Sequence, residues 1–192
     1  KSELYDYKIP KKSNNLEEVP IVVMAGGKGA RMAPVTKILP KPLIPINEKP
    51  IIEHIIERFT DYGCINFFFT VNYKAKILKA YFEELNPVYN VSFVDENKPL
   101  GTAGSLQYLK TELKKPFFVT NCDILIKTDY SDLYSFHNNE KNDITLVAST
   151  KEHTIPYGTC ELNSDGFLSK INEKPTYDFL INTGLYVLNP KV

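Results

Sequence analysis

The segment PIVVMAGGKGARMAPVTKILPKPL, residues 20–43, carries the clearest structural pattern in the chain. Its residues 21–24 form a continuous apolar run, the pattern of a strand that is buried on both faces of a parallel sheet. Gly26, Gly27 and Gly29 follow at once, and without Cβ atoms they let backbone N–H groups converge on an anion. The segment therefore predicts a phosphate-binding loop at the end of a buried strand.

Two familiar phosphate-binding motifs do not fit this loop. A P-loop needs Ser or Thr directly after its lysine, which Lys28 lacks, and a dinucleotide fingerprint needs glycine where Met32 stands. Instead, Arg31, Lys37 and Lys41 are spaced along a chain that is stiffened by prolines. A rigid loop with fixed cations suits a triphosphate, whose charge must be neutralised while one phosphorus is attacked.

Outward from this loop, strand-like and helical segments alternate. Such alternation implies right-handed crossovers and a mostly parallel sheet with helices on both faces, which is a three-layer α/β/α, Rossmann-like fold. In sheets of this kind ligands bind beyond the carboxyl ends of the strands. The expected strands are 65–72, 91–96, 117–121 and 143–150, and the expected helices are 51–63, 74–85, a segment from about 102, and 131–139.

The two ends of the chain do not follow this alternation of strands and helices. Residues 158–163 and 167–173 flank the turn formed by residues 164–166, which predicts an antiparallel hairpin before a closing strand at 181–188. The first nineteen residues are polar and lack periodicity, which predicts a linker or tail. We therefore expect one catalytic domain over residues 20–192.

Composition excludes several classes of function. Lys plus Arg and Asp plus Glu each total 23, so no net field favours nucleic acid or an acidic membrane surface. Cys64, Cys122 and Cys160 lack the spacing of a disulfide framework or a zinc site, and the odd number of thiols suggests a reducing compartment. No run approaches the roughly 18 apolar residues of a membrane span. A cytoplasmic location is therefore expected.

The glycine-rich loop resembles the signature of sugar-1-phosphate nucleotidyltransferases, LAGGxGTRLxPxTxxxPKPLxP. The sequence departs from it at Ala30, where the family has Thr, and at Met24 and Met32, where it has Leu. Ala30 lacks a hydroxyl that could donate to a phosphate, a loss of about 0.5 to 1.5 kcal/mol for one neutral hydrogen bond. The matching residues are Ala25, Gly26, Gly27, Gly29, Arg31, Pro34, Thr36, Pro40, Lys41, Pro42, Leu43 and Pro45.

This resemblance implies a fold of the nucleotide-diphospho-sugar transferase, GT-A-like type and a transfer reaction. The phosphate of a sugar 1-phosphate attacks the α-phosphorus of a nucleoside triphosphate, giving a nucleotide-sugar and pyrophosphate. Arg31 and the glycine amides would hold the β and γ phosphates, and Lys41 the α-phosphate. Asp123, just past the strand at 117–121, falls where the family's metal-binding Asp sits and would hold Mg²⁺, which takes one or two carboxylates plus substrate phosphates.

The resemblance also implies the remaining contacts. The segment DENKPLGTAGSL, residues 95–106, resembles the family's nucleobase segment and implies base contacts from Glu96, Gly101 and Thr102. Near the end of the chain, Glu173 and Lys174 would meet the sugar hydroxyls and the sugar phosphate. The expected nucleotide-binding set is Ala25, Gly26, Gly27, Gly29, Ala30, Arg31, Glu96, Gly101 and Thr102; Gly158, Asn182 and Gly184 would shape the sugar pocket.

Within the family, the segments PIVVMAGGKG, VNYK and NCDILI look most like guanylyltransferases that follow a pair of CBS regulatory modules. Some of these make GDP-glucosamine for legionaminic acid synthesis, and others are described as mannose-1-phosphate guanylyltransferases. The resemblance therefore implies GTP with glucosamine 1-phosphate, or alternatively mannose 1-phosphate. It also implies upstream CBS modules joined through residues 1–19, a catalytic domain that continues beyond residue 192, and a homo-oligomer as one option.

The sequence argues against two other classes of function. A non-catalytic regulatory subunit with this fold would lose the charged positions, but Arg31, Lys41, Asp123 and Lys174 all remain. A dinucleotide-binding oxidoreductase would carry an acidic residue for the ribose at the end of the second strand, where Asn72 stands. The residues thus favour a transferase over both alternatives.

Overall fold

The computed structural model describes residues 16–96, 101 and 103–192. The chain divides into two compact units. The first combines the chain up to Leu146 with Gly184–Val192, and the second is Val147–Thr183. The strands β7 and β10 each run through both units.

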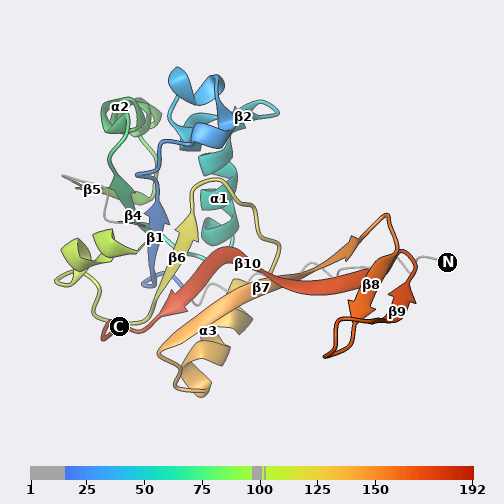
Figure 1. Ribbon diagram of the computed structural model, residues 1–192. Helices are drawn as coiled ribbons and strands as arrows, with labels where there is room; N and C mark the ends of the chain where they lie inside the picture. Colours follow the sequence, from blue (N-terminus) through green and yellow to red (C-terminus); the bar gives the residue numbers. More distant parts are fainter. Residues whose placement is uncertain (1–15, 97–100, 102) are drawn as a thin grey trace. The chain divides into compact units, whose positions relative to one another are not determined.

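A six-stranded sheet in the order β5-β4-β1-β6-β10-β7 organises the first unit (Figure 1). β1 pairs in parallel with both β4 and β6, and β4 pairs in parallel with β5, whereas β10 runs antiparallel to β6. The expected mostly parallel sheet is therefore confirmed. Its strands are β1 Pro20–Met24, β4 Asn66–Val71, β5 Asn90–Asp95, β6 Phe117–Asn121, β7 Ile144–Thr154 and β10 Thr176–Leu188.

The α-helices cover one face of this sheet through aromatic contacts. Phe59 of α1 packs edge-on against Phe67 of β4 and Phe118 of β6, with ring centroids 6.4 and 5.5 Å apart. Tyr130 of α3 lies 4.5 Å from Phe59, and Phe82 of α2 packs on β4 as well. No helix in the described ranges is long and apolar enough to cross a membrane. The helices are α1 Ile51–Thr60, α2 Ala75–Leu85 and α3 Tyr130–Asn139.

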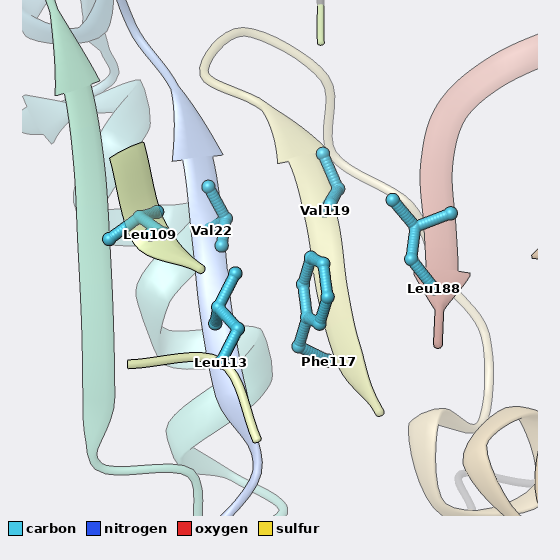
Figure 2. Packing of buried hydrophobic residues seen from close by; sticks show 6 residues of the cluster. All are labelled: Val22, Leu109, Leu113, Phe117, Val119 and Leu188. Atoms are coloured by element: carbon cyan, nitrogen blue, oxygen red, sulfur yellow. The ribbon is translucent and has the colours of Figure 1, made fainter. Parts of the chain in front are cut away.

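The opposite face carries a second apolar cluster (Figure 2). Val22 of β1 and Val119 of β6 pack there with Leu109 and Leu113, which belong to the segment between β5 and β6. The expected α-helix from about residue 102 is instead a 3₁₀ helix, η4, Gly104–Leu109. Its first residue is glycine, a poor helix former, and the run is too short to repay helix nucleation. Leu106 and Leu109 of η4 nevertheless pack in the apolar cluster on this face of the sheet.

In the second unit, β8 Thr159–Leu162 pairs antiparallel with β9 Leu168–Asn172. Asn163 closes the turn because its side-chain oxygen accepts the N–H groups of Asp165 and Phe167, at 3.1 and 2.8 Å. Gly166 has φ +83°, a conformation that favours glycine. The hairpin expected from the sequence is confirmed.

The packed part of the first unit begins earlier than the expected start at Pro20. Leu16 and Val19 are 2% and 4% exposed, and the N–H of Val19 donates to the carbonyl of Leu16 at 3.0 Å. Two apolar side chains among the polar residues 11–19 carry no periodic signal, which explains why the sequence pattern does not reveal them.

Burial of His137 in α3 predicts a pH-dependent stability. The side chain is 1% exposed, and burial lowers its pKa from the ordinary value of 6.5, with Asp143 opposing the shift. The contribution of neutral His137 is complete above about pH 6.5 and is lost as pH falls below it, because only the unfolded chain readily takes up the proton. We expect the free energy of unfolding to fall by at most about 1.4 kcal/mol per pH unit from this one group.

Urea unfolding of the wild type and of His137→Gln between pH 7.5 and 5 measures this contribution. The variant should show a flatter dependence on pH, whereas His153→Gln, which replaces an exposed histidine, should follow the wild type. Equal slopes for wild type and His137→Gln would contradict the prediction.

Candidate active site

The topology places a crevice at the carboxyl ends of β1 and β6. The chain passes from β1 to β4 and β5 on one side, and β6 lies on the other side of β1, so this is the switch point at which open α/β sheets bind ligands. A cavity of about 790 Å³ opens there. It is lined by Met24, Gly26, Gly27, Gly29, Ala30, Arg31, Met32, Lys41, Thr70, Glu96, Gly101, Asn121, Cys122, Asp123 and Ile124.

The loop after β1 folds into three short 3₁₀ turns, η1 Ala30–Met32, η2 Val35–Lys37 and η3 Lys41–Leu43. Gly29 has φ +62°, and a Cβ there would lie 2.8 Å from the Cγ2 of Thr36, so only glycine fits. The buried Thr36 hydroxyl donates to the carbonyl of Gly29 at 3.0 Å. These contacts hold the glycine-rich segment against the proline-rich one.

Lys41 and Asp123, distant in sequence, form an ion pair at the cavity wall. The Nζ of Lys41 lies 2.5 Å from Oδ2 of Asp123, and the two side chains are 22% and 23% exposed. The first residue of η3 thus meets the loop that leaves β6. The pair places one cation and one carboxylate beside the glycine loop.

Cys122 lines the same cavity but is not suited to act as a nucleophile. The pKa of its thiol is raised to about 12, chiefly by burial and also by the neighbouring Asp123 carboxylate, against the opposing effect of Lys41. Because the thiolate is the reactive form, a thiol with this pKa stays inert near neutral pH. The site thus supports transfer without a covalent intermediate on Cys122.

The far side of the cavity is formed by the end of β5. A Cβ on Gly26 would lie 3.0 Å from a carboxylate oxygen of Glu96, so this carboxylate lies directly against the glycine loop. The backbone of Glu96 is held by Asn72, whose side-chain N–H donates to its carbonyl at 2.6 Å. Gly101 also lines the cavity. Thr102, the third residue expected to contact the base, lies outside the described residues.

One nucleotide-binding residue expected from the sequence is placed in the sheet rather than on the cavity. Ala25 is 3% exposed, and its N–H donates to the carbonyl of Thr70 at 2.9 Å, continuing the pairing of β1 with β4. Its role in binding stays a prediction. The other described members of the nucleotide-binding set all line the cavity.

The donor set fits a divalent cation that is held partly by substrate. Among the described residues there is no group of three or more His, Cys, Asp or Glu side chains that could hold a metal. Mg²⁺ typically takes one or two carboxylates and completes its shell with waters and substrate phosphates. The carboxylate of Asp123, next to a loop suited to phosphates, matches that requirement.

The residues expected at the sugar 1-phosphate are divided between the two units. Gly158, Glu173, Lys174 and Asn182 belong to the second unit, where Glu173 Oε2 lies 3.1 Å from the position of a Cβ on Gly158. Gly184 belongs to the first unit. It has φ +78°, and a Cβ there would lie 2.3 Å from the side-chain nitrogen of Asn121, so any larger residue would displace that amide.

Two polar residues that line the cavity, Asn121 and Thr70, are not among the site residues expected from the sequence. They end or nearly end β6 and β4, strands that otherwise consist largely of apolar residues. A polar residue at the carboxyl end of a buried strand was the available signal, because such ends meet at one edge of a parallel sheet.

An α/β sheet with a glycine-rich loop, fixed cations and a carboxylate at its switch point defines a nucleotide-binding transferase architecture. The Nucleotidyl transferase family model matches residues 21–192, and the chain belongs to this family. It is 37% identical over 183 residues to a mannose-1-phosphate guanyltransferase of Schizosaccharomyces pombe, covering 89% of this chain and 50% of that protein. It is 35% identical over 181 residues to a mannose-1-phosphate guanylyltransferase catalytic subunit beta of Drosophila pseudoobscura pseudoobscura, covering 89% and 48%.

A solved structure supports the same fold. The chain is similar to HddC from Yersinia pseudotuberculosis complexed with GMP-PN, with a TM-score of 0.71 and 27% identity over 90% of this chain and 77% of that chain. The chain spans about half the length of the curated relatives it matches.

Proposed function

We propose that the protein is a sugar-1-phosphate guanylyltransferase, which joins a hexose 1-phosphate to GTP and releases pyrophosphate. The observation that carries this proposal is the Lys41–Asp123 pair, which lies beside a glycine-rich loop at the switch point of the sheet. The family and the relatives' names support the same class of reaction. A regulatory subunit would not need this pair or Arg31.

In the proposed reaction, a phosphate oxygen of the sugar 1-phosphate forms a bond to the α-phosphorus of GTP as the bond to the pyrophosphate oxygen breaks. The protein positions the reactants and neutralises charge. Arg31 and the glycine loop hold the β and γ phosphates, and Lys41 exchanges Asp123 for the α-phosphate. Mg²⁺, when bound, would neutralise part of the phosphate charge, and Asp123 is the residue that would hold it.

We assign the choice of guanine to Glu96. A carboxylate offers two acceptor oxygens, and guanine presents two adjacent donors, N1–H and the N2 amino group, whereas uracil presents one N–H between two carbonyls. Because Glu96 lies at the cavity wall against Gly26, its carboxylate can accept both guanine donors. Hydrogen bonds to a charged group contribute about 1.5 to 3 kcal/mol each, enough to select one base.

The variant Glu96→Gln tests this assignment. It replaces one acceptor oxygen with a donor, so we expect kcat/KM for GTP relative to UTP to fall by about 10- to 100-fold. Glu83→Gln, the same change at an exposed position on α2, should leave the ratio unaltered. An unchanged ratio in Glu96→Gln would show that another group reads the base.

For the sugar, the sequence resemblance suggests glucosamine 1-phosphate, while the curated relatives are named for mannose 1-phosphate. Both are hexose 1-phosphates, which is the substrate class we propose. Within the second unit, the residues proposed to hold this substrate are Glu173 and Lys174 with Gly158 and Asn182.

The experiment that tests the function measures pyrophosphate release with Mg²⁺. GTP, CTP, UTP, ATP and dTTP are crossed with the 1-phosphates of mannose, glucosamine and glucose. Release confined to GTP and one sugar would establish the base and the sugar together. A folded protein that releases pyrophosphate with no pair would overturn the proposal in favour of a regulatory subunit.

A further inference from the structure

Residues 72–74, which follow β4, do not line the cavity but contact both of the loops that form it. Asn72 binds the carbonyl of Glu96, as described above. The ammonium of Lys74 donates to the carbonyls of Lys37 and Ile38 at 2.6 and 2.7 Å. This segment therefore fixes the proline-rich loop and the base segment to the same strand end.

The two hydrogen bonds of Lys74 lie close enough to Lys41 along the chain to restrain its backbone. Lys37 ends η2, and only two residues, Leu39 and Pro40, separate Ile38 from Lys41. The same η2 turn holds Gly29 through Thr36, and a Cβ on Gly29 would lie 3.5 Å from the Cβ of Lys41. Anchoring the end of η2 therefore restricts the backbone from which the Lys41 side chain extends.

The backbone conformation of Lys74 indicates that this position requires the lysine side chain, because the conformation itself does not favour lysine. Lys74 has φ +56°, a left-handed conformation that glycine and asparagine adopt far more readily than lysine. It also precedes α2 as the N-cap, where glycine is well tolerated. Lysine offers no advantage to the backbone here, but its ammonium supplies donors for two carbonyls that would otherwise lack this partner.

We propose that Lys74 is a positioning residue: its ammonium holds the carbonyls that precede Lys41 and thereby sets where the Lys41 cation meets the triphosphate. The catalytic part of this inference rests on the proposed function. The positioning part does not, because it concerns the order of the loop itself. The two parts can be measured separately.

Hydrogen exchange of the ligand-free protein tests the positioning. In Lys74→Met, the amides of Leu39 and Leu43, which donate to Val35 and Pro40, should exchange about tenfold faster, while amides of β1 should not change. Lys76→Met, which removes a cation from an exposed position of the same helix, should exchange as the wild type does. Unchanged protection of Leu39 and Leu43 in Lys74→Met would overturn the proposal, whatever reaction the protein catalyses.

Kinetics test the consequence for the reaction. In Lys74→Met we expect kcat to fall by about 10- to 100-fold while KM for the sugar 1-phosphate stays within about twofold, since a small misplacement of Lys41 affects the reacting phosphate. Lys74→Arg, which keeps the donors, should recover most of kcat. If the wild type is inactive while loop protection still depends on Lys74, the proposed function fails and the positioning stands.

Lys74→Gly separates positioning from folding. It removes the ammonium but also relieves the left-handed backbone, so its thermal stability should equal or exceed that of Lys74→Met. Its kcat and loop protection should be as low as those of Lys74→Met. A Lys74→Gly variant with wild-type kcat and protection would overturn the proposal.

Discussion

Replacing Asp123 with Asn is expected to lower kcat by about 10³-fold, because this carboxylate is the proposed ligand of the divalent cation. Asn keeps the shape of the side chain and one oxygen, but it lacks the charge that binds a divalent cation. The change also removes the ion pair with Lys41, which lies 2.5 Å away. The measurement is pyrophosphate release at saturating GTP over a titration of Mg²⁺, in which the variant should need more Mg²⁺ to reach its lower rate.

Asp132→Asn is the matched control, because it makes the same chemical change in the first turn of α3, away from the residues that line the cavity. It should retain wild-type kcat and the same Mg²⁺ requirement. An Asp123→Asn variant with near-normal turnover would exclude Asp123 as the metal-holding residue.

Replacing Lys41 with Met is expected to lower kcat by about 10²-fold, with a smaller change in KM for GTP. In the proposed reaction the ammonium of Lys41 faces the α-phosphate, where charge develops as the new bond forms. An interaction that strengthens in the transition state appears in kcat rather than in KM. Steady-state kinetics with GTP and the preferred sugar 1-phosphate measure both quantities.

Lys37→Met provides the control within the same loop: the sequence grouped Lys37 with Arg31 and Lys41 as triphosphate cations, but the structure leaves it exposed and outside the cavity lining. It should leave kcat within about twofold of the wild type. If Lys41→Met changed KM for GTP while kcat stayed constant, Lys41 would contribute only to ground-state binding.

The effects of Asp123→Asn and Lys41→Met on kcat should also be strongly non-additive. Lys41 and Asp123 are in direct contact and serve one reacting phosphate, so the loss in the double variant should be smaller than the product of the single losses. Independent effects would indicate that the ion pair in the ligand-free protein has no functional counterpart.

Much of the fold could be predicted from local patterns. The apolar run before Ala25 predicts a buried strand, and the strand and helix at residues 66–71 and 75–85 lie close to their expected positions. The α-helix expected after Gly101 is wrong, because a leucine pattern at helical spacing does not distinguish an α-helix from a short 3₁₀ turn. The difference depends on how the segment fits against the sheet, where Leu109 and Leu113 pack.

The sequence specifies the chemical groups: glycines, fixed cations, and the carboxylates of Glu96 and Asp123, all in loops that follow strands. Only the tertiary structure decided which of these groups meet, placing Lys41 against Asp123 and Glu96 against Gly26, and connecting Lys74 to the loop that carries Lys41. The physical reason is that composition and spacing act along the chain, whereas contacts between strand ends depend on the order of strands in the sheet.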